Sequence, residues 1–170
     1  MKNFVKWGIY ITAVNVVFML IGYVAGTSTQ PAGRYMGWAS MIIGLGMLFW
    51  GIREKKNEDP SSFTFGRGWV EGVLISIVAG VLVAIVLYIF AEYINPEMLD
   101  YSRGEALKNL STMPSEQQEQ AKKMIELFTS APMISVMTLI FYVFGGMIVS
   151  LVLSPIVKSM GGNSGQSETV

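Results

Sequence analysis

The amino-acid sequence predicts an all-α fold: a four-helix transmembrane bundle with an extracytoplasmic helical hairpin between the third and fourth spans. The first reason is length, because a bilayer core of about 30 Å needs about 20 apolar helical residues. The second is composition, since 52% of residues are hydrophobic and only 14% are charged, against about 25% charged in soluble domains. The predicted spans are Trp7–Ala25, Tyr35–Ile52, Trp69–Ile94 and Met133–Val157.

The 170 residues are expected to form a single integral membrane domain over 1–160, with a disordered Gly/Ser-rich tail over 161–170. The start of the chain also resembles a secretory signal, because Lys2 and Lys6 precede an apolar run. That run, at about 18 residues, is longer than the 7–15 of a signal core. We therefore expect an uncleaved first span.

The connections between the first three spans support this organisation. The short, polar segment 26–31 predicts that the first two spans form an antiparallel helical hairpin. The second span stops at the charged run 53–56, and aromatic residues, including Trp69, then lead into the third. Thr64 is the candidate N-cap of that helix.

The segment 95–131 is the one sizeable soluble part of the chain. Asn95-Pro96 predicts a stop followed by a new helix, and Ser115 begins a second helix. The segment is expected to be an amphipathic hairpin on the membrane surface, ending at Pro132 before the fourth span. The apolar stripe of its second helix supplies the residues expected to contact lipid headgroups or a protein partner: Met124, Ile125 and Phe128.

The placement of Lys and Arg predicts the orientation. Seven lie at the N-terminus, in the loop between the second and third spans, and at Lys158. Arg34 and the four basic residues of 95–131 lie on the other side. Because dense basic clusters stay in the cytoplasm, both termini are predicted to be cytoplasmic.

Small residues recur at every fourth position in two spans, where they let helix backbones approach closely. We interpret them as helix-packing positions, and a pore lined by these faces is the alternative. The third span contributes Gly72, Ser76, Gly80 and Ala84, and the fourth contributes Gly146, Ser150 and Ser154.

Asn15 is the one strongly polar side chain near the middle of a span. It is expected to hydrogen-bond across helices, and contact with a substrate is the alternative. No Asp, Glu, Lys or Arg lies near a predicted midplane. Since proton-coupled transporters and ion pumps usually need such a group, this argues against those classes.

The composition also bears on catalysis and cofactors. The chain has no cysteine and no histidine, which excludes disulfides, thiol chemistry, Cys/His metal sites and His-based acid–base catalysis. We predict no catalytic residues, no metal site and no cofactor, and the zero net charge gives no case for nucleic acid. Ser154 and Lys158 have the spacing of a nucleophile and base, but snorkelling explains a lysine at a span end, and Pro155 disturbs the helix between them.

The chain resembles the DUF4199 family of small four-span bacterial inner-membrane proteins. The resemblance rests on Gly51-Ile52-Arg53-Glu54-Lys55-Lys56, on Ser62-Phe63-Thr64-Phe65-Gly66 followed by Gly72, on Ile94-Asn95-Pro96-Glu97, and on the charged helical loop before Pro132. It implies a location in the bacterial inner membrane. Because the family's function is unknown, it implies no active site.

We therefore predict a non-enzymatic inner-membrane protein that is a structural or interaction module, with membrane lipid and a protein partner or a second copy as its contacts. The alternative is a small transporter or channel subunit formed by oligomerisation. Its solute path would be lined by Asn15, Ser76, Tyr88 and Tyr142. A third hypothesis, an intramembrane enzyme, would need a polar cavity converging on Ser154 and Lys158.

Overall fold

The computed structural model describes residues 1–28, 30, 33–108, 110 and 115–160, and in this part of the chain it is helical throughout, with short connections. At 33, 34, 115 and 116 it describes the backbone alone. The predicted tail, 161–170, lies outside the described residues. The helices are α1 (Asn3–Val24), α2 (Gly33–Glu58), α3 (Phe65–Ile89), the π-helical turn η1 (Phe90–Ile94) that continues α3, α4 (Glu97–Lys108), α5 (Ser115–Phe128) and α6 (Ala131–Ser159).

Four of these helices are long and apolar enough to cross a bilayer, which confirms the all-α, four-span prediction. They are Asn3–Val24, Tyr35–Glu58, Phe65–Ile94 and Ala131–Ser159. The chain is therefore a multi-pass membrane protein. Each helix extends beyond the predicted span at one end or both. In α1 and α2 the added residues include Asn3, Glu54 and Lys56, whose side chains form polar contacts with neighbouring helices.

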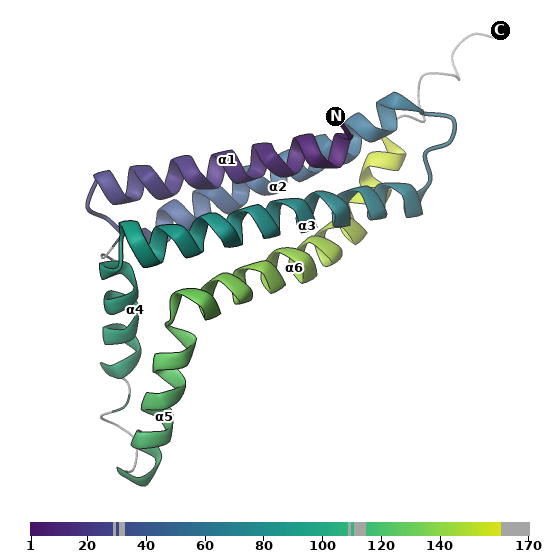
Figure 1. Ribbon diagram of the computed structural model, residues 1–170. Coiled ribbons are helices and arrows are strands. Elements are labelled where there is room, and N and C mark those ends of the chain that lie inside the picture. The colour runs from purple at the N-terminus through teal and green to yellow at the C-terminus, as the bar shows by residue number, and fades with distance from the viewer. Residues whose placement is uncertain (29, 31–32, 109, 111–114, 161–170) are drawn as a thin grey trace, which may run out of the picture.

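The four spans form a bundle in which α3 lies between α1 and α6 and also contacts α2 (Figure 1). We call the end where α1 begins and α6 finishes the terminal end. The opposite end is the arm end, because α4 and α5, together the arm, project there across the direction of the spans (Figure 1). The arm's two helices contact each other, and each also contacts the end of a span.

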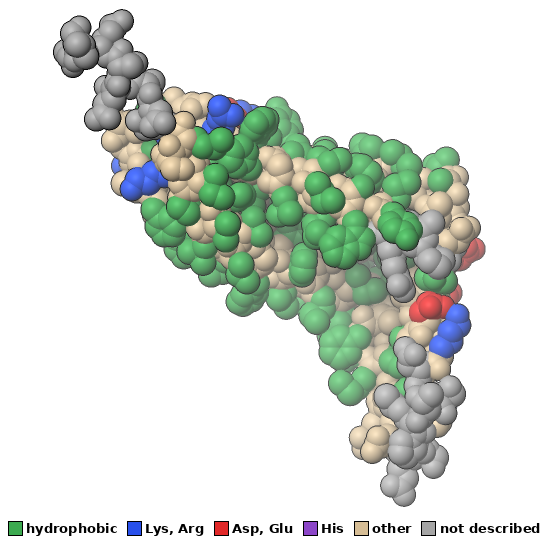
Figure 2. Space-filling view, turned by 180° about the vertical axis from the view of Figure 1, so that it is seen from behind, with side chains coloured by type: hydrophobic (Ala, Val, Ile, Leu, Met, Phe, Trp, Pro, Cys, Tyr) green, Lys and Arg blue, Asp and Glu red, His purple; other side chains and the backbone are tan. Residues whose placement is uncertain are grey.

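The buried core is small and lies on the terminal side of the bundle. Ile52 and Ile75 are completely buried at its centre, with Leu48 and Val157 beside them. Large apolar side chains instead cover the outside of the spans (Figure 2); Phe141, for example, is 66% exposed. This inverted pattern is expected where hydrocarbon surrounds the bundle, since burial then brings no hydrophobic gain.

Helix starts and interruptions follow local chemistry. Thr64 caps α3 as predicted, because its hydroxyl accepts from the Arg67 N–H at 3.3 Å. Pro132 does not precede the fourth span but lies in the first turn of α6, where a missing N–H costs nothing. Pro155 lies inside α6 without ending it, a tolerance typical of membrane helices packed against neighbours.

Candidate functional site

Two adjoining cavities occupy the interior of the bundle between its middle and the arm end. The larger has a volume of about 620 Å³ and extends to the arm, where Met98 and Tyr101 of α4 line it. The smaller, about 380 Å³, lies deeper and is lined by α1, α2, α3 and α6. The two share Asn15, Gly37, Ser40 and Tyr142. Each volume is within the range of about 300–1,000 Å³ that is usual for ligand pockets.

A polar cluster from three helices marks the place where the cavities meet. Asn15 of α1 donates from Nδ2 to the Ile11 carbonyl at 2.9 Å, and its Oδ1 accepts from the Ser40 hydroxyl of α2 at 3.0 Å. The phenol of Tyr142, on α6, interacts with the Asn15 side chain. The cluster therefore links α1, α2 and α6 at a level where the surrounding side chains are mostly apolar.

The walls of the cavities are otherwise apolar and rich in aromatic residues and methionine. Phe18, Met36, Leu87 and Phe90 line the larger cavity between the cluster and the arm. Polar side chains reappear at its mouth, including Ser28 and Ser102. The smaller cavity is walled by residues such as Ile11, Leu48, Ala79 and Phe141, with Ser76 as a further hydroxyl.

The cavities carry almost no charge. Among the described residues that line them, none is Lys or Arg, and the one carboxylate belongs to Glu105 at the mouth. Glu105 forms an ion pair with Lys108, one turn along α4. The Glu105 carboxylate raises the pKa of Lys108. A charged ligand would therefore find no free counter-charge in the described lining, whereas an uncharged one meets hydroxyl and amide groups.

The small residues of α3 and α6 meet face to face along one seam. Gly72 lies directly against Ser150, Gly68 against Ser154, and Ser76 against Gly146. At Gly80 a Cβ would approach the Tyr142 Cβ to 2.7 Å. Ala84, one turn further along, is half-buried.

Of the residues proposed for a solute path, the structure brings together Asn15, Ser76 and Tyr142, all of which line the smaller cavity. Tyr88 lies elsewhere, with its ring 6.3 Å from that of Tyr93 in an edge-to-face pair. Ser40, which sequence reasoning missed, completes the cluster. Its partner Asn15 was recognisable because it stands alone in an apolar span, whereas a serine in a span is too common to be informative.

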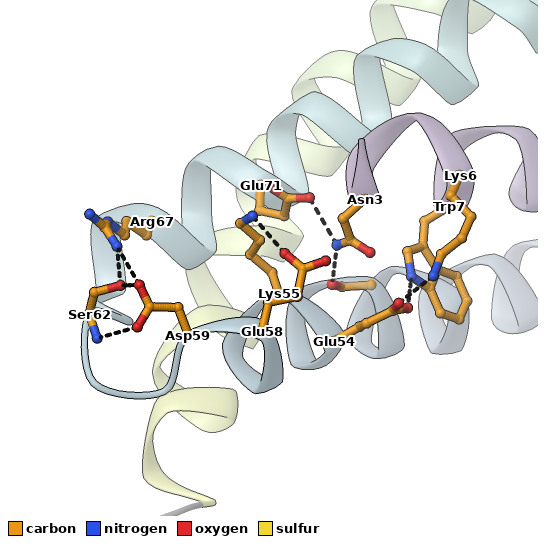
Figure 3. A network of polar contacts seen from close by, with 11 residues as sticks. Asn3, Lys6, Trp7, Glu54, Lys55, Glu58, Asp59, Ser62, Arg67 and Glu71 are labelled. Carbon is orange, nitrogen blue, oxygen red and sulfur yellow. Dashed lines mark hydrogen bonds and ion pairs between the residues drawn. The ribbon is translucent and has the colours of Figure 1, made fainter. Parts of the chain in front are cut away.

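A network of polar contacts ties the helices together at the terminal end (Figure 3). Glu54 of α2 accepts from the Lys6 ammonium and, at 2.7 Å, from the Trp7 indole N–H of α1. Asn3 donates from Nδ2 to the Gly51 carbonyl and to the Glu71 carboxylate of α3, both at 2.9 Å. These contacts join α1, α2 and α3 within a single layer.

Glu71 of α3 lies beside the first turn of α1 and supplies the negatively charged acceptor that α1 lacks among its own first residues. The N-cap residue of α1, Lys2, makes no side-chain capping bond, and the first turn holds no acidic residue. The buried Glu71 carboxylate accepts from the Asn3 side chain at 2.9 Å and lies close to the Phe4 backbone N–H. A negative charge beside free N–H groups at a helix N-terminus is stabilising, so Glu71 acts as a tertiary cap.

The last turn of α6 is capped in the complementary way. The Lys56 ammonium of α2 donates to the carbonyls of Val157 at 2.9 Å and Lys158 at 3.1 Å. A cation here satisfies carbonyls that have no partner within the helix. Ser154 of α6 donates to the Phe65 carbonyl of α3 at 2.7 Å. All four spans are thus bonded to one another at the terminal end.

The connection between α2 and α3 is ordered by Asp59. Its carboxylate accepts from the hydroxyls of Ser62 and Ser61 and lies 3.7 Å from the Arg67 guanidinium. The Ser62 hydroxyl, then that of Ser61, holds the pKa of Asp59 below its ordinary value. The Asp-Pro-Ser-Ser composition is the one feature of the sequence that could have indicated this turn.

The arm presents two different faces. Met124 is 58% exposed and Phe128 44%, with Leu127 beside them, while Ile125 is half-buried. In Figure 2 the apolar surface of the bundle continues onto one side of the arm, and acidic and basic side chains gather on the opposite side. On α5 itself, a spacing of 3.6 residues per turn places Met124, Leu127 and Phe128 on one face and the charged residues on the opposite face.

The residues suggested for catalysis do not converge on a cavity. Ser154 is fully buried and its hydroxyl is bonded to Phe65. Lys158 is exposed at the end of α6. Within the described residues there is no group of three His, Cys, Asp or Glu side chains able to hold a metal ion.

The sequence model of DUF4199, described as a protein of unknown function, matches residues 6–159. This chain belongs to the DUF4199 family. The match covers the arm and all four spans from Lys6 onward, so the cavities of this DUF4199 protein lie within the matched region, whereas Asn3 of the terminal network lies before it. No curated protein and no solved structure matches the chain.

Proposed function

We propose that this DUF4199 protein is a non-enzymatic component of the bacterial inner membrane that works as an interaction module, with the arm as its contact element. The observation that carries the proposal is the exposed apolar face of α5, formed by Met124, Leu127 and Phe128. A helix with one apolar and one charged face lies in the membrane interface. We propose that lipid of the protein's own membrane covers this face.

The charged face of α5 is then left for a protein partner. It consists of Glu119, Lys122, Lys123 and Glu126, all exposed, and Lys123 lies 3.3 Å from Glu119. Mixed charges on an exposed surface favour specificity and association rate in protein contacts. At the terminal end, by contrast, polar side chains form hydrogen bonds to other helices of the bundle.

Site-specific photo-crosslinking in cells tests the proposal. A photoreactive residue at Glu126 is expected to give discrete protein adducts, and the charge-reversing pair Lys122→Glu and Lys123→Glu should remove them. The matched control is a photoreactive residue at Trp50, on the outside of α2, which should yield lipid adducts only. Adducts that persist after the charge reversal would contradict a partner site on this face.

The proposed orientation places both termini in the cytoplasm and the arm outside. Because the chain has no cysteine, single cysteines report it cleanly. In intact spheroplasts, a membrane-impermeant maleimide should label Gln120→Cys and not Ser62→Cys. Labelling of Ser62→Cys and not of Gln120→Cys would show that the protein has the opposite orientation.

The second candidate function is a small transporter or channel subunit formed by oligomerisation. The cavities lined by Asn15, Ser40 and Tyr142 favour it. In the described monomer the fully buried Ile52, Ile75 and Val157 fill the bundle on the terminal side of the cavities. Solute flux into liposomes above that of empty vesicles would support this candidate.

A further inference from the structure

We propose that the cavities bind an uncharged, carbonyl-bearing lipid whose head lies deep in the bilayer, such as a quinone with a hydrocarbon tail. The head would accept a hydrogen bond from the cluster of Asn15, Ser40 and Tyr142, and the tail would occupy the apolar walls. The inference concerns the interior of the bundle and is independent of the role proposed for the arm.

The hydrogen-bonding capacity of the cluster indicates an acceptor. Its three side chains carry two amide and two hydroxyl hydrogens. One amide hydrogen of Asn15 is bonded to the Ile11 carbonyl, and the Ser40 hydroxyl hydrogen is bonded to Asn15. The contact between Asn15 and Tyr142 uses at most one more. At least one hydrogen is therefore free for a ligand, and in an apolar cavity an unpaired donor is costly.

The electrostatics of the lining select against charged heads. No described lining residue is Lys or Arg, and the Glu105 carboxylate is paired with Lys108. Moving an unpaired charge from water or from the headgroup region to this depth is strongly unfavourable. Phosphate and carboxylate heads are therefore disfavoured, while a ketone or ester carbonyl matches the free donor.

The depth of the cluster narrows the choice among uncharged lipids. Asn15 lies about 14 Å from Val24, the arm end of α1, at 1.5 Å per residue. The head of an acylglycerol belongs to the interfacial region, so reaching Asn15 would draw it into hydrocarbon. A quinone ring on a hydrocarbon chain is uncharged and only weakly hydrated, so it can enter the hydrocarbon region. Its carbonyls can therefore reach the depth of Asn15.

A lateral entry for such a lipid lies between α2 and α6. Lys56 holds these two helices together at the terminal end. Toward the middle of the membrane the smaller cavity is bordered by Met41 and Leu45 of α2 and by Phe141 of α6, all exposed on the outside of the bundle. A hydrocarbon chain can enter there directly from the bilayer.

Glycines with open space around them give a test that leaves the fold intact. Gly37 lines both cavities, and a Cβ at this position meets nothing within 4 Å. Gly46, on the same helix, is exposed like Gly37 and also has open space around it, but it lines neither cavity. Gly37→Leu therefore fills the cavity, and Gly46→Leu is its matched control.

The experiment is native mass spectrometry of the detergent-solubilised protein with a decyl-benzoquinone as probe, and with monodecanoylglycerol and decanoate as comparison lipids. One quinone per monomer is expected, with the comparison lipids bound more weakly. Gly37→Leu should weaken quinone binding at least tenfold, while Gly46→Leu should not. Tyr142→Phe should weaken it about fivefold, the equivalent of one hydrogen bond, while Tyr88→Phe, outside the cavities, should not.

Either of two results would overturn the proposal. Quinone binding that Gly37→Leu and Tyr142→Phe leave unchanged would place the probe outside the cavity. Equal binding of decanoate and the quinone would contradict the inference that the cavities disfavour lipids with a charged head. Thermal unfolding of each variant is recorded in parallel, and Tyr142→Phe, which removes a single oxygen, keeps the test decisive if Gly37→Leu unfolds.

Discussion

At the scale of single residues, Glu71 and Lys56 each satisfy a helix end that lies far away in the chain. Glu71 accepts from the first turn of α1, and Lys56 donates to the last carbonyls of α6. Helix termini leave backbone groups unpaired, and close to a membrane water cannot be relied on to satisfy them. Charged residues at span ends thus cap neighbouring helices in addition to setting the orientation of the protein in the membrane.

Replacing Glu71 should destabilise the protein more than replacing other carboxylates at this end. Glu71→Ala removes the acceptor of the Asn3 side chain and the negative charge beside the Phe4 N–H, and should cost about 1.5–3 kcal/mol, the usual range for buried bonds to a charged group. The measurement is thermal unfolding in detergent. Glu58→Gln is the control, because Glu58 pairs with Lys55 at an exposed position. Equal effects of the two changes would argue against a capping role for Glu71.

The pKa of Asp59 should respond to a single hydroxyl. The Ser62 hydroxyl is the main cause of the lowered pKa of Asp59, so Ser62→Ala should raise that pKa toward its ordinary value of 3.8. Because the folded pKa is depressed, the contribution of this turn to stability is complete above pH 3.8 and is lost as the pH falls through the folded pKa. Carboxyl ¹³C NMR of the Asp59 side chain in micelles measures the titration. No movement of the Asp59 titration in Ser62→Ala would refute the assignment.

At the scale of elements, the packing of α3 on α6 depends on small residues placed opposite one another. Gly72 lies against Ser150, and Gly146 against Ser76. The Trp69 indole N–H donates to the Met147 carbonyl at 3.1 Å across the same contact. Because helix association in lipid has little hydrophobic driving force, close backbone approach and dispersion must supply it. The arm differs, since its α5 helix leaves its apolar face uncovered by the rest of the described chain.

Two glycines on this pair of helices should give opposite results. A Cβ at Gly72 would collide with Ser150 and lie 2.9 Å from Ile52 Cδ1, so Gly72→Ala should destabilise the bundle by about 1–3 kcal/mol. A Cβ at Gly145 meets nothing within 4 Å, so Gly145→Ala should be neutral, or stabilising by up to about 1 kcal/mol through helix propensity. Steric-trapping or thermal measurements in detergent compare the two. If the two substitutions changed the stability in the same direction, the contact between α3 and α6 at Gly72 would not be tightly packed.

At the scale of the whole molecule, the two ends of the bundle differ in construction. The terminal end bonds all four spans together through Lys56, Glu54, Glu71 and Ser154. The arm end holds the cavities and the projecting arm. We therefore expect rigid-body movement of the spans to pivot about the terminal end and to change the cavities most.

Lys56 should control the separation of α2 and α6. In Lys56→Met the α6 carbonyls lose their donor, so spin labels at Trp50→Cys and Val152→Cys, both exposed, should show a longer and broader distance distribution by pulsed EPR. Lys55→Met is the matched control, because the Lys55 bond, at 2.8 Å, is to Glu58 of the same helix. A distribution unchanged in Lys56→Met would mean that other contacts fix α2 against α6.

Local sequence was enough to predict the four spans, the helices of the arm and the Thr64 cap, because each depends on residues that are close in the chain: apolar runs, breakers and a capping hydroxyl. It also singled out Asn15, whose polarity conflicts with its surroundings. The packing of the helices was needed to show that Asn15 meets Ser40 and Tyr142 beside a cavity, and that Glu71 and Lys56 cap distant helices. The physical reason is that lipid accepts many arrangements of four apolar helices, and the choice among them depends on close packing and on a few hydrogen bonds between residues far apart in sequence.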